Sequence, residues 1–362
     1  MTIYGSLSYI PYLSFYASLA LLFMMVFGFN PLSYAMDMPT SLFFGNEINI
    51  SSNNGTSDLP QIATQGSNVY VVWQDDTSGN KEVYYSRSID HGKNFGIIRN
   101  LSNNTGSSEV PQIATQGSNV YVAWQDDTSG NKEVYFKRSP NNGISFKGKK
   151  VDISNNNGSS ELPQIATQGS NVYVAWQDNT SGDYDAYFKH IYDYGRKFVK
   201  GTSNISRNAG QSIHPDIGAF DKNVYVIWKE IERGKDRIFF KSGAVGETPL
   251  KIKFSSTYKI PYGGDVSGPI VAIGPNFFYS LWVTNKKDTS SVIDFYPIKL
   301  FEDTSPEPIS LTRPSSNGNI TNVSIATSGN DAYIGWVNMN SGNGDIYLKR
   351  LSIDSFDRSK SS

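Results

Sequence analysis

Six tryptophans recur along this chain at almost constant intervals. They are Trp73, Trp124, Trp176, Trp228, Trp282 and Trp336, so 51 to 54 residues separate each from the next. The surrounding sequence returns as well, most completely in residues 111–136, with near copies that begin at Pro60 and Pro163. A period of this length is typical of proteins whose units bury their apolar faces only by stacking on one another. The sequence therefore predicts six copies of one structural unit.

Each unit has the pattern of four short β-strands. In the second repeat we expect strands at 112–116, 119–125, 133–138 and 149–153, bounded by turn residues. Residues 119–125 place Val120, Val122 and Trp124 on one face and Tyr121 and Ala123 on the other, so both faces are apolar. Four-stranded sheets packed face to face around an axis cover both faces. The predicted fold is all-β: a six-bladed β-propeller of four-stranded antiparallel blades.

The two ends of the repeat array are complementary. The last repeat ends after its third strand, at residues 345–351, whereas residues 44–51 precede the first repeat and read like the outer-strand segments 149–154 and 200–206. We expect residues 44–51 to pair with the C-terminal hairpin and complete the last blade, which would leave no open sheet edge. The propeller then spans 44–356, between a short linker at 36–43 and a polar tail at 357–362.

A recurring hairpin turn carries a family resemblance. Ser88, Asp90, Gly92 and Phe95 follow the pattern Ser-x-Asp-x-Gly-x-x-aromatic; Ser139, Asn141, Gly143 and Phe146 repeat it, as do Asp193, Gly195 and Phe198 without the serine. This motif resembles the Asp-box, or BNR repeat, of sialidase-like β-propellers. The resemblance implies the six-bladed sialidase-type fold, with the motif in a structural turn role: its carboxylate accepts backbone N–H bonds and its glycine takes a positive φ.

The N-terminal 35 residues have the composition of an export segment. Residues 12–29 form an apolar run, and Ser33, Tyr34 and Ala35 resemble a signal-peptidase site, although no Lys or Arg precedes Lys81. We expect residues 1–35 to be either a cleaved signal peptide or a retained membrane anchor. The mature protein is then secreted or held at the cell surface.

Composition excludes several kinds of site and partner. The chain has no cysteine, which rules out disulfides, thiolate metal sites and cysteine nucleophiles. Its net charge of −1 and the lack of a basic stripe argue against nucleic acid as a partner. We expect a monomer that contacts a membrane only through an N-terminal anchor.

Two sets of carboxylates recur at equivalent positions. Asp58, Glu109 and Glu161 lie two residues before the proline that opens an inner strand, and Asp75, Asp126, Asp178 and Glu230 lie two residues after a tryptophan. Both positions fall in loops expected on one face of a propeller. The seven residues are our candidate binding rim. They suit a Ca²⁺ site, since hard cations need several oxygen ligands. The alternative is that these side chains cap their own loops.

An enzymatic interpretation is the second alternative. The resemblance implies, for a sialidase, three arginines on the substrate carboxylate, a tyrosine nucleophile with its glutamate, and an aspartate as acid/base catalyst. No Arg-Ile-Pro type motif of that family occurs here, and the first three repeats are almost identical, whereas a catalytic site needs a different group from each blade. We assign no catalytic residue. If catalysis exists, it belongs to the diverged half, where the candidates are Arg207, Glu230, Arg233, Arg237, Tyr262, Asp265 and Arg313.

The sequence-based interpretation is therefore an exported, non-catalytic binding module. Its ligand would be a glycan, a protein or a cation outside the cell. The alternative is an exo-α-sialidase-like glycoside hydrolase with a divergent active site.

Overall fold

The computed structural model describes residues 46–207, 210–246, 252–261, 264–274, 277–285, 291–299, 308–312, 320–328, 331–339 and 344–352. The expected signal or anchor at 1–35, the linker at 36–43 and the tail at 357–362 lie outside these ranges, as do Tyr262 and Arg313. Within the described ranges, no helix has the length and apolar character needed to cross a membrane.

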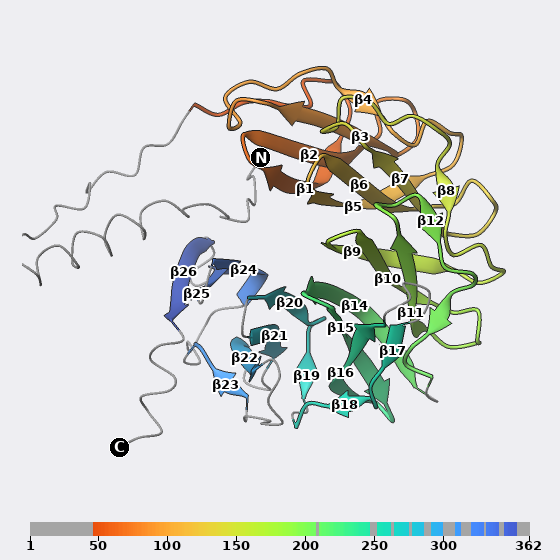
Figure 1. Ribbon diagram of the computed structural model, residues 1–362. Helices are drawn as coiled ribbons and strands as arrows, with labels where there is room; N and C mark the ends of the chain where they lie inside the picture. The colour runs from red at the N-terminus through yellow and green to blue at the C-terminus, as the bar shows by residue number, and fades with distance from the viewer. Residues whose placement is uncertain are drawn as a thin grey trace, which may run out of the picture.

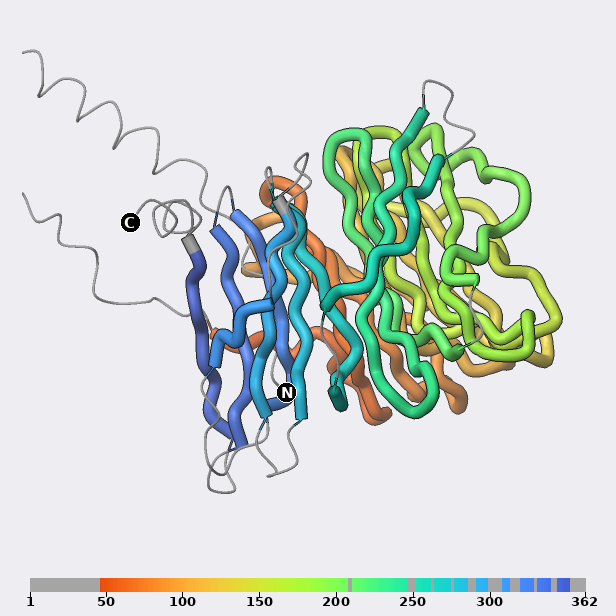
Figure 2. The backbone as a smooth tube through the Cα atoms, turned by 90° about the horizontal axis from the view of Figure 1, so that it is seen from below, coloured from red at the N-terminus to blue at the C-terminus, as the bar shows by residue number. Residues whose placement is uncertain are grey.

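Six antiparallel sheets surround a common axis (Figure 1), so the predicted six-bladed β-propeller is confirmed. Each sheet is built from strands that are consecutive in the chain, and the innermost strands β1, β5, β9, β14, β20 and β24 face the centre of the ring. The strands of neighbouring blades run in a common direction (Figure 2). Their connecting loops therefore collect on two opposite faces of the ring.

The first three blades follow the repeat closely. Blade one contains β1 (Ser57–Gln65), β2 (Asn68–Asp75), β3 (Glu82–Ser88) and β4 (Arg99–Asn100); blade two contains β5 (Ser108–Gln116), β6 (Asn119–Asp126), β7 (Glu133–Ser139) and β8 (Val151–Asp152); blade three contains β9 (Ser160–Gln168), β10 (Asn171–Asp178), β11 (Asp185–Tyr192), β12 (Lys197–Phe198) and β13 (Ser203–Asn204). In blade two, the inner strand begins four residues before the predicted 112–116, and the outer strand is only two residues long.

The last three blades are less regular. Blade four contains β14 (Gln211–Phe220), β15 (Asn223–Glu232), β16 (Lys235–Val245), β17 (Ile252–Phe254) and β18 (Tyr258–Lys259); blade five contains β19 (Asp265–Val266), β20 (Ile270–Ile273), β21 (Phe277–Asn285), β22 (Ser291–Lys299) and β23 (Ile309–Ser310); blade six contains β24 (Ile320–Ser328), β25 (Asp331–Asn338) and β26 (Asp345–Ser352). Blade six thus forms a three-stranded sheet within the described residues.

The hydrophobic core lies between successive blades. Val120, Val122 and Trp124 of β6 pack on blade one, and Tyr121 and Ala123 of the same strand pack on blade three. This two-sided burial is the one expected from the alternation in 119–125. Five such clusters join blades one to six in order, and no cluster of the described residues joins blade six to blade one. All six tryptophans are buried, with exposed fractions of at most 9%.

Hydrogen bonds from side chains to backbone carbonyls add a second connection between blades. Lys137 Nζ reaches back to Leu101 O at 2.9 Å, just beyond the outer strand of the preceding blade. Lys241 and Lys349 make the same bond to Ile205 O and Leu311 O. Each lysine thereby holds the outer segment of the blade before it.

The described part of the expected closing strand, residues 46–51, forms no strand. Blade one has Ser86 where blades two, four and six have the bridging lysine, and serine is too short to reach a preceding outer segment. The chain just after this segment contacts blade one, where Asn53 Nδ2 donates to Asp75 Oδ2. On β26, whose outer edge is unpaired in the described residues, Ile346 and Leu348 stay 71% and 64% exposed. The described part of the expected closing segment thus does not complete the last blade, and the last sheet keeps an open edge in the described residues.

Candidate functional site

One face of the ring carries the loops that join the outer strand of a blade to the inner strand of the next, together with the loops between second and third strands. We call it the loop face. The carboxylates of the candidate rim are placed at this end of the strands, because β5 begins at Ser108 and β6 ends at Asp126, and these two residues are paired in the sheet. The same pairing joins Ser57 to Asp75 and Ser160 to Asp178.

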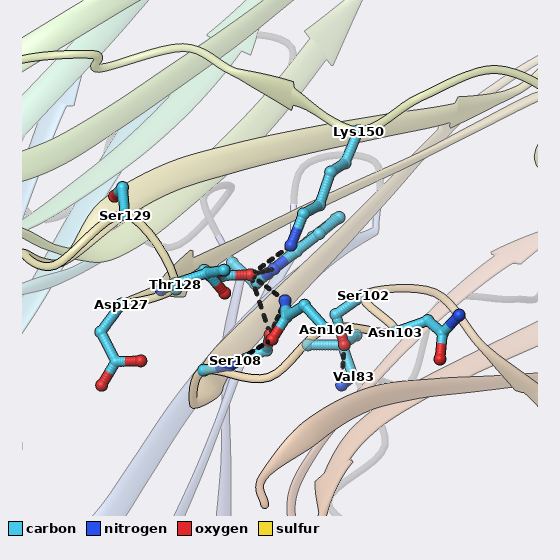
Figure 3. A network of polar contacts seen from close by, with 12 residues as sticks. Val83, Ser102, Asn103, Asn104, Ser108, Asp127, Thr128, Ser129 and Lys150 are labelled. Carbon is cyan, nitrogen blue, oxygen red and sulfur yellow. Dashed lines mark hydrogen bonds and ion pairs between the residues drawn. The ribbon is translucent and has the colours of Figure 1, made fainter.

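Asp126 is fully buried under the loop face. Three of the side chains that donate to its carboxylate, Asn104, Ser108 and Lys150, are labelled in Figure 3. Oδ2 accepts hydrogen bonds from Asn104 Nδ2 at 2.6 Å, Ser108 Oγ at 2.9 Å and Lys150 Nζ at 2.7 Å, and also from the indole N–H of Trp124. Oδ1 accepts the backbone N–H of Thr128 at 3.0 Å. This aspartate therefore ties the loop after β4, the start of β5 and the turn after β6 into one unit.

Asp75 and Asp178 repeat this arrangement without a lysine. Each accepts from the tryptophan two residues before it and from a serine at the start of the inner strand. Burial alone would raise the pKa of Asp75, but hydrogen bonds from Ser57, Thr77 and Asn53 outweigh it and lower the pKa to about 2. Asp75 is therefore ionised at neutral pH, and the carboxylate oxygens of both aspartates are already occupied by protein donors.

Glu230, the fourth member of this set, differs. It lies on β15 opposite Arg237, is 6% exposed, and burial raises the pKa of its carboxyl. The repeat has drifted here, because Arg237 stands where the first two blades have a third-strand glutamate.

The other rim carboxylates lie nearer the surface and pair across blades. Lys81 Nζ of blade one contacts Glu109 Oε1 of blade two at 2.9 Å, and Lys132 Nζ contacts Glu161 Oε1 of blade three at 3.6 Å. Asp58 is exposed. The structure thus separates the seven candidates into buried aspartates that hold loops, glutamates paired with lysines, the exposed Asp58 and the buried Glu230. Among the described residues, no group of three or more Asp, Glu or His side chains could hold a metal ion.

Sequence reasoning missed a second set of buried carboxylates. Glu82, Glu133 and Asp185 open the third strands and are 2–4% exposed. Each accepts a serine hydroxyl from the following loop, namely Ser102, Ser154 and Ser206, and that hydroxyl in turn accepts a backbone N–H of the third strand. The recurrence of a serine about 20 residues after each acid was the available signal.

A β-bulge shapes the rim of the central channel. Leu59, Val110, Leu162, His214 and Asn322 occupy one equivalent position and all have φ between 47° and 52°. A branched residue such as valine rarely adopts this left-handed conformation, so the position is strained and held by its surroundings. In the first three blades a glutamine supplies that support: the Oε1 atoms of Gln74, Gln125 and Gln177 accept the bulge N–H of the next blade at 2.9–3.1 Å.

The hairpin turn at 88–95 lies on the opposite face. Ser88 Oγ accepts the backbone N–H of Gly92, and Asp90 Oδ1 accepts both the hydroxyl of Ser88 and the backbone N–H of Asn94. These hydrogen bonds, the one from Ser88 first, hold the pKa of Asp90 well below its usual range.

The two later turns keep parts of this geometry. Asn141 Oδ1 accepts the hydroxyl of Ser139 and the backbone N–H of Ser145. Asp193 instead forms ion pairs with Arg196 and Lys197. Gly92, Gly143 and Gly195 all have φ between 71° and 83°.

The aromatic residues of the later turns pack across blades. Phe146 meets Tyr85 edge-on at 4.9 Å between ring centroids, and Phe198 meets Phe136 at 5.9 Å. Phe254 makes the same contact with Phe188 at 5.1 Å, although blade four has no recognisable motif.

The architecture is similar to that of solved carbohydrate-active propellers. The NanB sialidase of Streptococcus pneumoniae superimposes with a TM-score of 0.51 at 10% identity, over 84% of this chain and 69% of that chain. The α-L-arabinofuranosidase Arb93A of Fusarium graminearum superimposes with a TM-score of 0.50 at 9% identity, over 82% and 93%. No protein-family model matches the chain, and no curated protein is similar to it in sequence. At these identities the similarity shows the fold alone.

Proposed function

We propose that this chain is an extracytoplasmic, non-catalytic binding propeller that takes a glycan on its loop face. The observation that carries the proposal is the state of the rim carboxylates. Asp75, Asp126 and Asp178 are buried and saturated with hydrogen bonds from their own loops.

Most glycoside hydrolases need two carboxyl groups that flank the scissile bond, one of them able to give or take a proton. A carboxylate such as that of Asp126, which accepts from Lys150, Trp124 and two loop side chains, is removed from such a role. Glu109 and Glu161 are neutralised by lysines of the preceding blade. On this proposal, the carboxylates of the loop face stabilise the loops, and the loops bind the glycan.

Three further observations support the proposal. The hydrogen bonds within 88–95 fit an Asp-box, which supports a relation to sialidase-like propellers. The similar solved folds belong to a sialidase and an arabinofuranosidase, so a glycan ligand is compatible with this architecture. The apolar run at 12–29 fits export.

A pull-down with glycans and cell-envelope extracts, run beside a fluorogenic sialidase assay on the same protein, tests the proposal. We expect retention of the protein on immobilised glycans and no hydrolysis above a buffer control. Hydrolysis that is abolished by a substitution at Glu230, Arg233 or Arg237 would instead establish the sialidase-like alternative. Failure to bind any glycan would contradict the proposed function itself.

A further inference from the structure

A pocket of about 260 Å³ opens on the loop face between blades five and six. Its polar lining comes from Ser267, Asn285, Thr321 and Asn322, and its apolar wall includes Trp282 and Val283. Thr321 and Asn322 are exposed, whereas Val283 lies in the core between the two blades and Trp282 in the core between blades four and five. A largely apolar pocket with a few polar groups around its mouth is the usual form of a small-molecule site.

The pocket coincides with a position at which the repeat has changed. In blades one to three, the glutamine that follows the tryptophan extends into the space between its own blade and the next. Gln125 Oε1 accepts the N–H of Leu162 in the next blade at 3.0 Å, while its Nε2 donates to Glu109 at 3.2 Å. Blade five has Val283 at this position, which is shorter and has no side-chain hydrogen-bonding atom. The pocket lies beside Val283 and Asn322, the counterparts of Gln125 and Leu162.

The chemistry of the lining selects its ligand. Among the described residues, every lining side chain is uncharged. Hydroxyls and side-chain amides both donate and accept hydrogen bonds, which suits the hydroxyl groups of a sugar. A carboxylate brought into this pocket would lose water without meeting a cationic partner, and that exchange is unfavourable. The first half of the rim offers the opposite environment, since Glu109 and Glu161 each face a lysine there.

We propose that this pocket binds one neutral sugar residue at the end of a glycan, and that it discriminates against acidic sugars such as sialic acid. The inference rests on the proposed glycan-binding function and specifies its site and ligand class. It also gives a physical meaning to the replacement of glutamine by valine at residue 283: the space that a bridge fills elsewhere becomes available to a ligand.

The test uses a galactose-terminated oligosaccharide and its sialylated counterpart as titrants, with calorimetry on the full chain. We expect the neutral probe to bind at least tenfold more tightly than the acidic one. Val283→Gln restores the repeat residue and should fill the pocket, which lowers affinity at least tenfold without lowering Tm. If Val283→Gln fails to fold, Thr321→Val tests the same site. It removes one hydroxyl at constant shape and should weaken binding severalfold.

Val151→Gln is the matched control, because it makes the same substitution at a 37% exposed valine on β8 of blade two, away from the pocket. Its affinity should equal that of the wild type. If Val283→Gln and Thr321→Val both bind like the wild type, glycan binding is real and the pocket assignment is overturned. Tighter binding of the sialylated probe overturns the ligand class. If neither probe binds but other glycans are retained in the pull-down, the neutral-sugar proposal falls and the proposed function stands.

Discussion

Blades one to three repeat one set of hydrogen bonds after each tryptophan, whereas blades four to six have different residues at those positions. In the first group, each tryptophan indole and each following aspartate are hydrogen-bonded to one another, and a glutamine bridges to the next blade. In the second group, the positions after the tryptophan carry Lys229, Val283 and Val337 instead. The repeated hydrogen bonds make blades one to three a rigid half of the ring. In blades four to six, loss of those contacts leaves space and an uneven distribution of charge, where specificity for a ligand can arise.

The tryptophans give the largest expected contrast. Trp124 is fully buried and packs on blade one, so Trp124→Ala should destabilise the protein by about 3 to 5 kcal/mol through the cavity it leaves. Trp336 of blade six is 9% exposed, beside the open end of the array, and Trp336→Ala should cost clearly less. Chemical denaturation of both variants measures the difference. Equal losses would show that blade six is packed as firmly as blade two.

The second contrast concerns the residue two positions after the tryptophan. Asp126→Asn removes a buried charge that receives Lys150 and the indole of Trp124, so we expect a loss of about 2 to 4 kcal/mol. Asn338 holds the same position in blade six, where its Oδ1 is buried without a partner among the described residues. Asn338→Ala should therefore change stability by less than about 1 kcal/mol. A larger loss of stability for Asn338→Ala than for Asp126→Asn would contradict the greater structural role that we assign to Asp126.

The third contrast appears in the pH dependence of stability. Burial raises the pKa of Asp216 to about 7, against 3.8 for the free side chain, although its oxygens accept the backbone N–H groups of Val271 and Ile217. The folded state thus favours the protonated acid. Its contribution is complete below pH 4 and is lost as pH rises toward 7.

Substitution by asparagine tests this pH dependence. Asp216→Asn should gain stability relative to wild type as pH rises from 4 to 7, by about 1 to 2 kcal/mol because the side chain is partly exposed. Gln164 is the equivalent residue of blade three, and Gln164→Asn should show no such trend. Thermal melts across this range measure both variants; parallel curves for Asp216→Asn and wild type would place the pKa near its ordinary value.

The smallest effect is expected for calcium. Because the oxygens of Asp75, Asp126 and Asp178 are already occupied by protein donors, millimolar Ca²⁺ should shift Tm by no more than a chelator does. A rise of several degrees in Ca²⁺, absent from Asp126→Asn, would restore the cation site that the acidic pattern first indicated. Asp90→Asn, on the opposite face, serves as the control.

Much of the fold could be predicted because it depends on short-range patterns. The tryptophan period, the alternation in 119–125 and the turn residues determine where strands form and which faces are apolar. The end of the ring was harder, since pairing of 44–51 depends on long-range contacts such as the lysine bridge that Ser86 does not make.

The candidate site was predictable only in part. Loop carboxylates look alike whether they cap turns or bind ligands, and their burial distinguishes the two. Asn53, Asn104 and Asn156 recur with those aspartates, and that covariation within the chain was the missed signal. The pocket near Val283 was invisible to motif analysis, because it results from the absence of a glutamine rather than from the presence of a motif.

The lysine bridges have a consequence for the order in which the protein opens. Lys137, Lys241 and Lys349 each hold the blade before them, and blade six has no described core cluster with blade one. Among the described residues, blade six is therefore anchored from one side only, so we expect the array to behave as a line of nearest neighbours in which local opening begins at an end. Backbone amides of β26 should exchange with deuterium first, and protection should increase through β22 and β15 toward the centre of the line.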